Sequence, residues 1–136
     1  MSDPAPIRVA TPRLPVAWGE VIDKLTILDI KCERLTDPTA LSNVRHERAI
    51  LAEAAREQLR GSSALREARD QLFEVNVALW EVEDALREKE SARAFDDAFI
   101  ALARSVYQQN DRRAALKKHI NILLGSEIVE EKSYKG

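Results

Sequence analysis

The sequence has little of what disulfide-bonded or β-rich proteins need. Cys32 is the only cysteine, so no intramolecular disulfide can form and nothing indicates an oxidising compartment. Only 4 glycines and 5 prolines occur among 136 residues, and all but one of the prolines precede residue 16. Turns between strands depend on these two residue types, so their scarcity excludes a β-sandwich.

Long apolar runs and an excess of one charge are also missing. The longest uninterrupted apolar run, residues 98–103, is far shorter than the ~20 residues that cross a bilayer. The 21 basic and 23 acidic side chains give a net charge of -2, which argues against a general nucleic-acid binder. The first residues lack the basic start and apolar core of a signal peptide. We therefore expect a cytoplasmic protein without a membrane span and without a nucleic-acid partner.

The residues that are present favour one helical domain. A content of 45% hydrophobic and 32% charged residues excludes a disordered or fibrous chain, and 136 residues is a usual length for a single domain. Ala, Leu, Glu and Arg dominate after the proline-rich start, as is typical of long helices. We expect an extended arm over residues 1–15, a helical domain over 16–125 and a polar tail over 126–136.

Apolar residues at alternating spacings of three and four predict four helices. Their expected limits are residues 16–36, 38–59, 63–90 and 96–125. The last two helices are each about 28 residues long, or roughly 42 Å, and the first two are shorter. The expected fold is all-α, an antiparallel four-helix bundle in which the long hairpin of the third and fourth helices projects. A projecting tip favours a homo-oligomer, with a dimer as the first guess.

The apolar pattern of the fourth helix breaks at Gln109 and Arg113. Burying an unpaired charge costs several kcal/mol, so Arg113 must be paired, solvated or met by a ligand. Counting residues along antiparallel helices places Arg113 at the level of Asn76. The same count, continued through the short loops, places Arg48 of the second helix there too.

Four more polar residues fall within two turns of this layer. Lys117 and Asn121 follow Arg113 along the fourth helix, at the level of Glu20 and Asp23 on the first. Clustered cations in a low-dielectric cleft suit the capture of carboxylate or phosphate, and a neighbouring carboxylate suits proton transfer. The sequence therefore predicts a polar layer inside the bundle.

Two interpretations of this layer remain open. In the first it is a structural ion network, in which acidic side chains neutralise Arg48, Arg113 and Lys117; the acids are Glu20, Asp23, Glu47 and Glu83. In the second it is a ligand site. There Arg48, Arg113 and Lys117 grip an anion, Asn76 and Asn121 orient it, and Glu20 or Asp23 acts as a base or as a Mg²⁺ ligand.

Other motifs give little support to catalysis. Glu-x-x-Asp occurs at residues 20–23 and 81–84, but the pattern is common and a plain salt bridge explains the second copy better than a metal does. His46 and His119 have no second metal-ligating side chain at helical spacing, so we interpret both as surface residues. Phosphate-binding glycine loops, nucleophile elbows and Cys-x-x-Cys pairs are absent. We predict no metal site and no cofactor, with Mg²⁺ only under the ligand hypothesis.

Several longer segments of the sequence resemble those of a known family. They include Trp18-Gly19-Glu20, Asp23-Lys24-Leu25-Thr26-Ile27-Leu28, Leu102-Ala103-Arg104-Ser105-Val106-Tyr107 and Gly125-Ser126-Glu127-Ile128-Val129-Glu130-Glu131-Lys132-Ser133-Tyr134. Together they resemble the bacterial domain-of-unknown-function family 6165 over nearly everything after residue 14. The resemblance implies a small all-helical protein with no settled activity, and a partner or substrate from sugar metabolism, because similar proteins accompany glycosyltransferases of surface-polysaccharide loci.

The resemblance has two structural implications. The tail belongs to the family pattern, so we expect it to fold back on the bundle. Ala17 stands where similar proteins often have Ser, so the first helix lacks a side-chain N-cap and its first turn is expected to fray.

The sequence thus predicts a helical interaction or accessory module with a mainly structural polar layer. The alternative is a binding protein or enzyme for an anionic metabolite, such as a phosphorylated sugar, a nucleotide or a carboxylate. A helical mutase is one form of this alternative, because its chemistry needs only cationic clamping and orientation. Whether the chain is an enzyme stays open.

Overall fold

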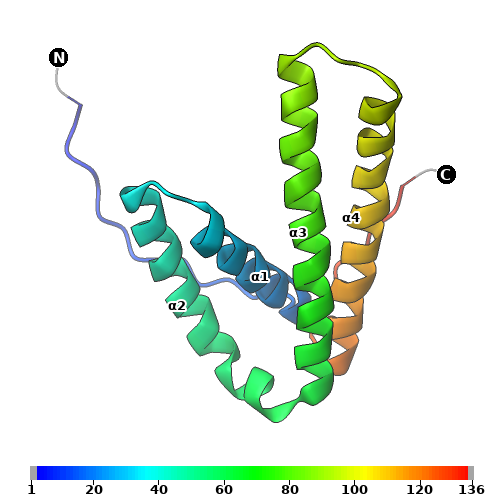
Figure 1. Cartoon of the computed structure of the whole chain (residues 1–136). Helices are drawn as coiled ribbons and strands as arrows, with labels where there is room; N and C mark the ends of the chain where they lie inside the picture. Colours follow the sequence, from blue (N-terminus) through cyan, green and yellow to red (C-terminus); the bar gives the residue numbers. More distant parts are fainter. Residues whose placement is uncertain (1–2, 135–136) are drawn as a thin grey trace.

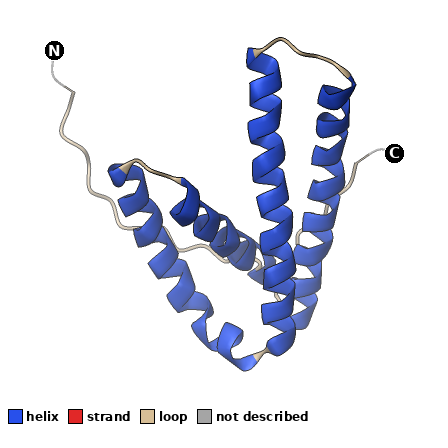
Figure 2. Ribbon diagram, in the orientation of Figure 1, coloured by secondary structure: helices blue, strands red, loops and turns tan. Residues whose placement is uncertain are grey.

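The computed structural model describes residues 3–134 and contains four helices (Figures 1 and 2). They are α1 (Trp18–Arg34), α2 (Pro38–Gly61), α3 (Ser63–Ser91) and α4 (Asp97–Leu123). Residues 3–134 contain no strand. The all-α prediction is therefore confirmed, and the predicted helix limits are correct to within two residues.

Side-chain caps fix where three of the helices begin. Asp37 accepts a hydrogen bond from the Ala40 N–H at 2.9 Å before α2, and Asp96 accepts one from the Phe99 N–H at 3.0 Å before α4. The Ser62 hydroxyl accepts from the Leu65 N–H at 3.1 Å at the start of α3. Each oxygen satisfies an N–H group that has no partner within its helix.

The helices form two hairpins that diverge from a common base (Figure 1). α3 and α4 pack on each other, and α1 contacts all three other helices. α2 contacts α1 and α3, but it has no contact with α4. The hairpin of α1 and α2 leans away from the hairpin of α3 and α4, so the bundle is open like a V.

The hydrophobic core lies at the base of the V. Every helix contributes to its buried cluster, which consists of Ile22, Leu25, Ala55, Leu65, Ala68, Leu72 and Ile120. Beyond this base the packing thins, because no residue between 77 and 119 is buried. We call residues 77–112 the distal hairpin. Its first turns still border α1, where Ile27 and Ile30 lie beside Leu79 and Trp80. Beyond α1 it projects from the core as a two-helix arm (Figure 1).

α1 begins against the last turn of α4. Ala17 gives no side-chain cap, but the Gly19 N–H donates to Asn121 Oδ1 at 2.7 Å and the Trp18 N–H donates to Ser126 Oγ at 3.2 Å. The expectation of a frayed first turn is wrong, because residues distant in sequence supply the missing acceptors. Gly19 permits this approach: a Cβ atom there would lie 2.4 Å from the Lys117 carbonyl oxygen.

Outside the helices, residues 3–17 and 124–134 carry no regular structure. The arm is exposed, as Ile7 shows at 87%. The tail lies along α4, where Lys118 bonds Glu131 at 3.1 Å and Lys132 bonds Asp111 at 2.7 Å. The outermost residues of the predicted arm and tail, 1–2 and 135–136, lie outside the described residues. Within residues 3–134, no helix combines the length and the apolar character that crossing a membrane requires.

Candidate functional site

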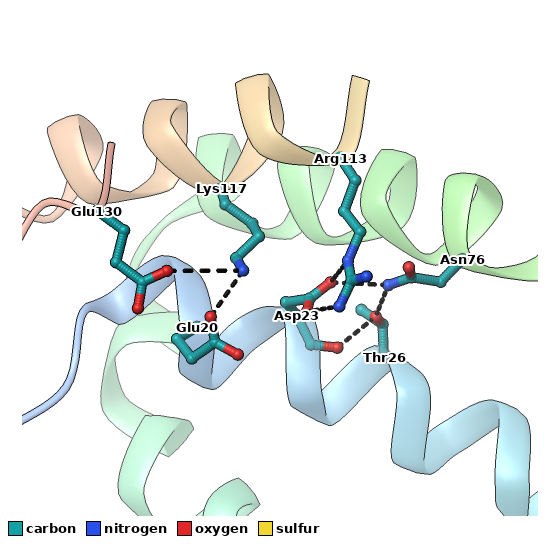
Figure 3. A network of polar contacts seen from close by, with 7 residues as sticks. All are labelled: Glu20, Asp23, Thr26, Asn76, Arg113, Lys117 and Glu130. Carbon is teal, nitrogen blue, oxygen red and sulfur yellow. Dashed lines mark hydrogen bonds and ion pairs between the residues drawn. The ribbon is translucent and has the colours of Figure 1, made fainter. Parts of the chain in front are cut away.

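Asp23 of α1 is the centre of a buried polar cluster (Figure 3). Its side chain is 1% exposed. Arg113 of α4 donates from Nε to Asp23 Oδ1 at 2.9 Å and from Nη2 to Oδ2 at 2.5 Å. Asn76 of α3 donates from Nδ2 to Oδ1 at 2.9 Å. A two-point arginine contact and an amide donor therefore compensate this buried carboxylate.

Thr26 closes the cluster from the next turn of α1. Its hydroxyl accepts from Asn76 Nδ2 at 2.8 Å and donates to the Asp23 carbonyl oxygen at 2.7 Å. We call Asp23, Thr26, Asn76 and Arg113 the Asp23 cluster. Over residues 3–134, no buried side-chain nitrogen or oxygen lacks a hydrogen-bond partner. The cluster thus ties α1, α3 and α4 together without leaving an unsatisfied polar group.

The electrostatics keep Arg113 charged. The hydrogen bond to Asp23 raises the pKa of the Arg113 guanidinium above its ordinary value, and partial burial opposes this rise without reversing it. The Arg113 side chain is 28% exposed, so part of it reaches the surface. Arg113 thus pairs with the buried carboxylate of Asp23, while part of its own side chain is exposed to solvent.

A second ion pair lies one turn further along α4. Lys117 Nζ donates to Glu20 Oε2 at 2.6 Å, and Glu130 of the tail is 4.0 Å away (Figure 3). Glu20 and Lys117 are both partly exposed. Asn121, one more turn along, uses its Oδ1 to accept from the Gly19 N–H, so the oxygen caps a helix.

The structure does not bring Arg48 to this layer, which corrects the count along the sequence. Arg48 of α2 donates from Nε to Asp29, and this bond raises the pKa of the Arg48 guanidinium. It lines a separate hollow with Cys32 and Phe73. The count assumed four aligned helices, whereas α2 leans away and has no contact with α4.

Two predicted acids also bond elsewhere. Glu47 pairs with Lys24 at 2.9 Å, and Glu83 lies 3.8 Å from Arg87. The Glu-x-x-Asp pair of α1 does not converge on one point, because Glu20 bonds Lys117 and Asp23 bonds Arg113. Within the described residues, no three His, Cys, Asp or Glu side chains are grouped as a metal site.

The sequence reasoning missed three contributors. Thr26 lies three residues after Asp23, so helical spacing places both on one face and was a usable signal. Asp29 was predictable on a different ground: α1 and α2 are adjacent in an antiparallel hairpin, so an acid of α1 can pair with a base of α2. Ser126 lies beyond α4, where no periodicity is present to place it.

The outer edge of the Asp23 cluster opens on a groove between α4 and the tail. The groove has a volume of 950 Å³, and its polar lining consists of Tyr107, Asn110, Asp111, Arg113, Lys117, Lys132 and Tyr134. Within this lining Asp111 pairs with Lys132 at 2.7 Å. An adjoining hollow of 690 Å³ extends to Glu20, Asn121 and Glu131. Donor groups and tyrosine rings here suit an anion that carries a flat or ring-shaped part.

Comparison with known proteins gives a family and no activity. No curated protein and no solved structure matches the chain. Residues 13–136 match the family described as "Family of unknown function (DUF6165)". The match covers nearly the whole chain and confirms the resemblance carried by the strings above; the protein belongs to the DUF6165 family.

Proposed function

We propose that this protein is a self-associating helical interaction module and that the Asp23 cluster is structural. The observation that carries the proposal is the internal pairing of the cluster. Asp23 bonds Arg113 and Asn76, and Glu20 bonds Lys117. An anion arriving at these cations would have to compete with carboxylates that the chain itself holds in place.

The distal hairpin supports the same proposal. None of residues 77–119 is buried, and large apolar side chains there remain exposed, among them Phe95 at 56% and Ile100 at 53%. A two-helix arm without a core of its own gains stability when other helices cover it. Helical surfaces of this kind are typical of protein–protein contacts.

The sequence analysis favours the cytoplasm, and we keep this location as part of the proposal. A protein partner from sugar metabolism, as the family resemblance implies, remains part of the proposal. Self-association can be tested without knowing which protein that partner is.

Size-exclusion chromatography with light scattering tests the proposal. We expect a molar mass of twice the 15.3 kDa of one chain, falling toward the mass of a single chain on dilution. The mass of a single chain at every concentration would overturn self-association.

A second candidate function rests on the groove beside α4. Arg113 Nη1 makes no hydrogen bond within residues 3–134, and Arg113, Lys117 and Lys132 all line the 950 Å³ groove. In this version the groove holds a phosphorylated sugar, nucleotide or carboxylate, and Glu20, which lines the adjoining hollow, acts as the base or Mg²⁺ ligand. Arg48 has no part in it, because it lies with Asp29 in another hollow.

A thermal-shift screen separates the two candidates. The ligands are inorganic phosphate, nucleotide sugars, nucleoside triphosphates with Mg²⁺ and dicarboxylates. A ligand at ten times its Kd stabilises by ~1.4 kcal/mol, which moves the midpoint by several degrees. The interaction module predicts no shift with any of them, whereas a saturable shift that Lys132→Ala abolishes would support the groove.

A further inference from the structure

We infer that the groove between α4 and the tail binds a nucleoside monophosphate, with the tail as one of its walls. The inference rests on the second candidate function, whose ligand it narrows to one class, and it does not depend on self-association. Small-molecule sites usually have volumes of about 300–1,000 Å³. The groove has 950 Å³ and therefore has room for a molecule of this size.

The cations of the groove have more donors than hydrogen bonds. Arg113 uses Nε and Nη2 toward Asp23, which leaves Nη1. Lys117 and Lys132 each donate one hydrogen bond, to a carboxylate. A guanidinium group carries five N–H donors and an ammonium group three. Several donors of these three side chains thus have no acceptor within residues 3–134, and an oxygen-rich ligand could supply it.

The acids around the groove limit the charge of that ligand. Asp23, Glu20 and Asp111 each accept from one of the three cations. Glu130 lies 4.0 Å from Lys117 Nζ. A triphosphate would meet these acids as well as the cations, and the repulsion grows with its charge. A single phosphate group offers several acceptor oxygens to the remaining donors with the least added charge, so the groove favours a monophosphate.

Two tyrosine rings line the same groove. Tyr107 belongs to α4 and Tyr134 to the tail, and both are exposed. Asn110 adds an amide that can donate and accept hydrogen bonds. Nucleobases stack on tyrosine rings, and their edges hydrogen-bond to amide groups. A nucleobase therefore uses both the rings and the amide, whereas a sugar phosphate or an aliphatic carboxylate leaves the rings without a stacking partner.

The tail supplies one ring and one cation to the groove. Lys132 Nζ lies 5.1 Å from the centre of the Tyr134 ring. Ion pairs with exposed acids fasten the tail to α4, namely Lys118 with Glu131 and Lys132 with Asp111. Such pairs add little stability on their own. A ligand that contacts both α4 and the tail should therefore hold the tail more firmly in place.

Isothermal titration calorimetry with adenosine monophosphate, adenosine and inorganic phosphate tests the inference. We expect the monophosphate to bind at least about tenfold more tightly than either fragment, because only it engages the rings and the cations together. Phosphate that binds as tightly as the nucleotide would overturn the inference, since the rings would then play no part. The absence of binding with the nucleotide in millimolar excess would overturn it as well.

Variants of the tail separate ligand contact from tail docking. Lys132→Ala and Tyr134→Ala should each raise the dissociation constant of adenosine monophosphate about fivefold or more. Both positions lie outside the helices, so these variants should fold. Lys118→Ala is the matched control, because it removes a tail ion pair but no residue that lines the 950 Å³ groove, and its affinity should stay within about twofold. Equal losses in all three variants would overturn the contacts assigned to Lys132 and Tyr134.

Hydrogen exchange gives a readout that does not depend on the heat of binding. Bound adenosine monophosphate should slow the exchange of backbone amides in residues 126–134, and unchanged exchange there would contradict the tail as a wall of the site.

The outcomes separate the inference from the functions proposed above. A dimer by light scattering that binds no nucleotide refutes the inference and leaves self-association standing. Binding of a phosphorylated sugar or a dicarboxylate in preference to the nucleotide refutes the inference and leaves the second candidate function standing. A chain that binds none of these anions refutes both the inference and the second candidate.

Discussion

At the scale of single residues, Asp23 fixes how α1 sits on the other helices. Its carboxylate is fully buried and takes donors from Arg113 of α4 and Asn76 of α3. A buried ion pair adds little net stability compared with well-packed apolar residues, but removing one partner leaves an uncompensated charge. We therefore assign the Asp23 cluster the role of setting the relative position of α1, α3 and α4.

Replacing Arg113 with Met should destabilise the protein by ~3 kcal/mol, because Asp23 would keep only its amide donor in a buried site. Urea denaturation at neutral pH measures this change. Asp23→Leu combined with Arg113→Met is the control: it removes both charges, so most of the loss should be recovered. An Arg113→Met variant as stable as the wild type would mean that the arginine does not neutralise Asp23.

At the scale of elements, the start of α1 is held by close backbone contact. Gly19 lies where a Cβ would be 2.4 Å from the Lys117 oxygen and 2.9 Å from its carbonyl carbon. Backbone atoms in a packed helix cannot yield as the end of a flexible side chain can. The Gly19 N–H bond to Asn121 depends on this approach.

Gly19→Ala should therefore destabilise by about 1–3 kcal/mol, as overpacking does, although helix propensity alone would favour Ala by about 1 kcal/mol. Thermal or urea unfolding gives the sign directly. Gly61→Ala is the matched control, because a Cβ at this last residue of α2 meets nothing within 4 Å. The two variants should differ in sign, and a Gly19→Ala variant as stable as the Gly61 control would contradict the close contact.

The cap of α4 makes an acid-sensitive contribution. The Phe99 N–H, and next the Lys89 ammonium, lower the pKa of Asp96 below its ordinary value of 3.8. A lowered folded pKa means that the stabilisation is present above the unfolded value and is lost as pH falls through the folded value. Asp96→Asn keeps an oxygen for the Phe99 N–H but no charge for Lys89. The stability advantage of wild type over Asp96→Asn should thus shrink between neutral pH and about pH 3, and an advantage independent of pH would contradict this.

The long hairpin explains why part of the site was predictable. α3 and α4 pack directly on each other as an antiparallel pair, so setting Leu123 opposite Leu65 placed Arg113 near Asn76. The same count of levels placed Lys117 near Glu20, which it contacts. Arg48 could not be placed in this way, because periodicity fixes which face of α2 is apolar but not its tilt. For the same reason, the divergence of the two hairpins could not be predicted from the sequence.

At the scale of the whole molecule, the chain has a packed base and two divergent arms. The core cluster draws on all four helices, whereas the distal hairpin has no buried residue. The tail adds charged contacts to α4, such as the Lys118 pair with Glu131. The course of the tail along α4 could not be predicted from the sequence, because exposed ion pairs produce no periodic pattern of residues.

This division of the molecule connects the cluster with the proposed function. The Asp23 cluster holds α1 across α3 and α4, and α1 packs along α2, so we expect the cluster to contribute to the angle of the V. In the proposed self-association, arms held at a fixed angle would present one preformed surface to a second copy. A preformed surface loses less conformational entropy on association than a flexible one.

Sedimentation equilibrium of the unmodified chain at neutral pH tests this account most directly. The account predicts a reversible equilibrium between the single chain and a species of twice its mass, with the larger species dominant at high concentration. A species with the mass of one chain over the whole concentration range would contradict it.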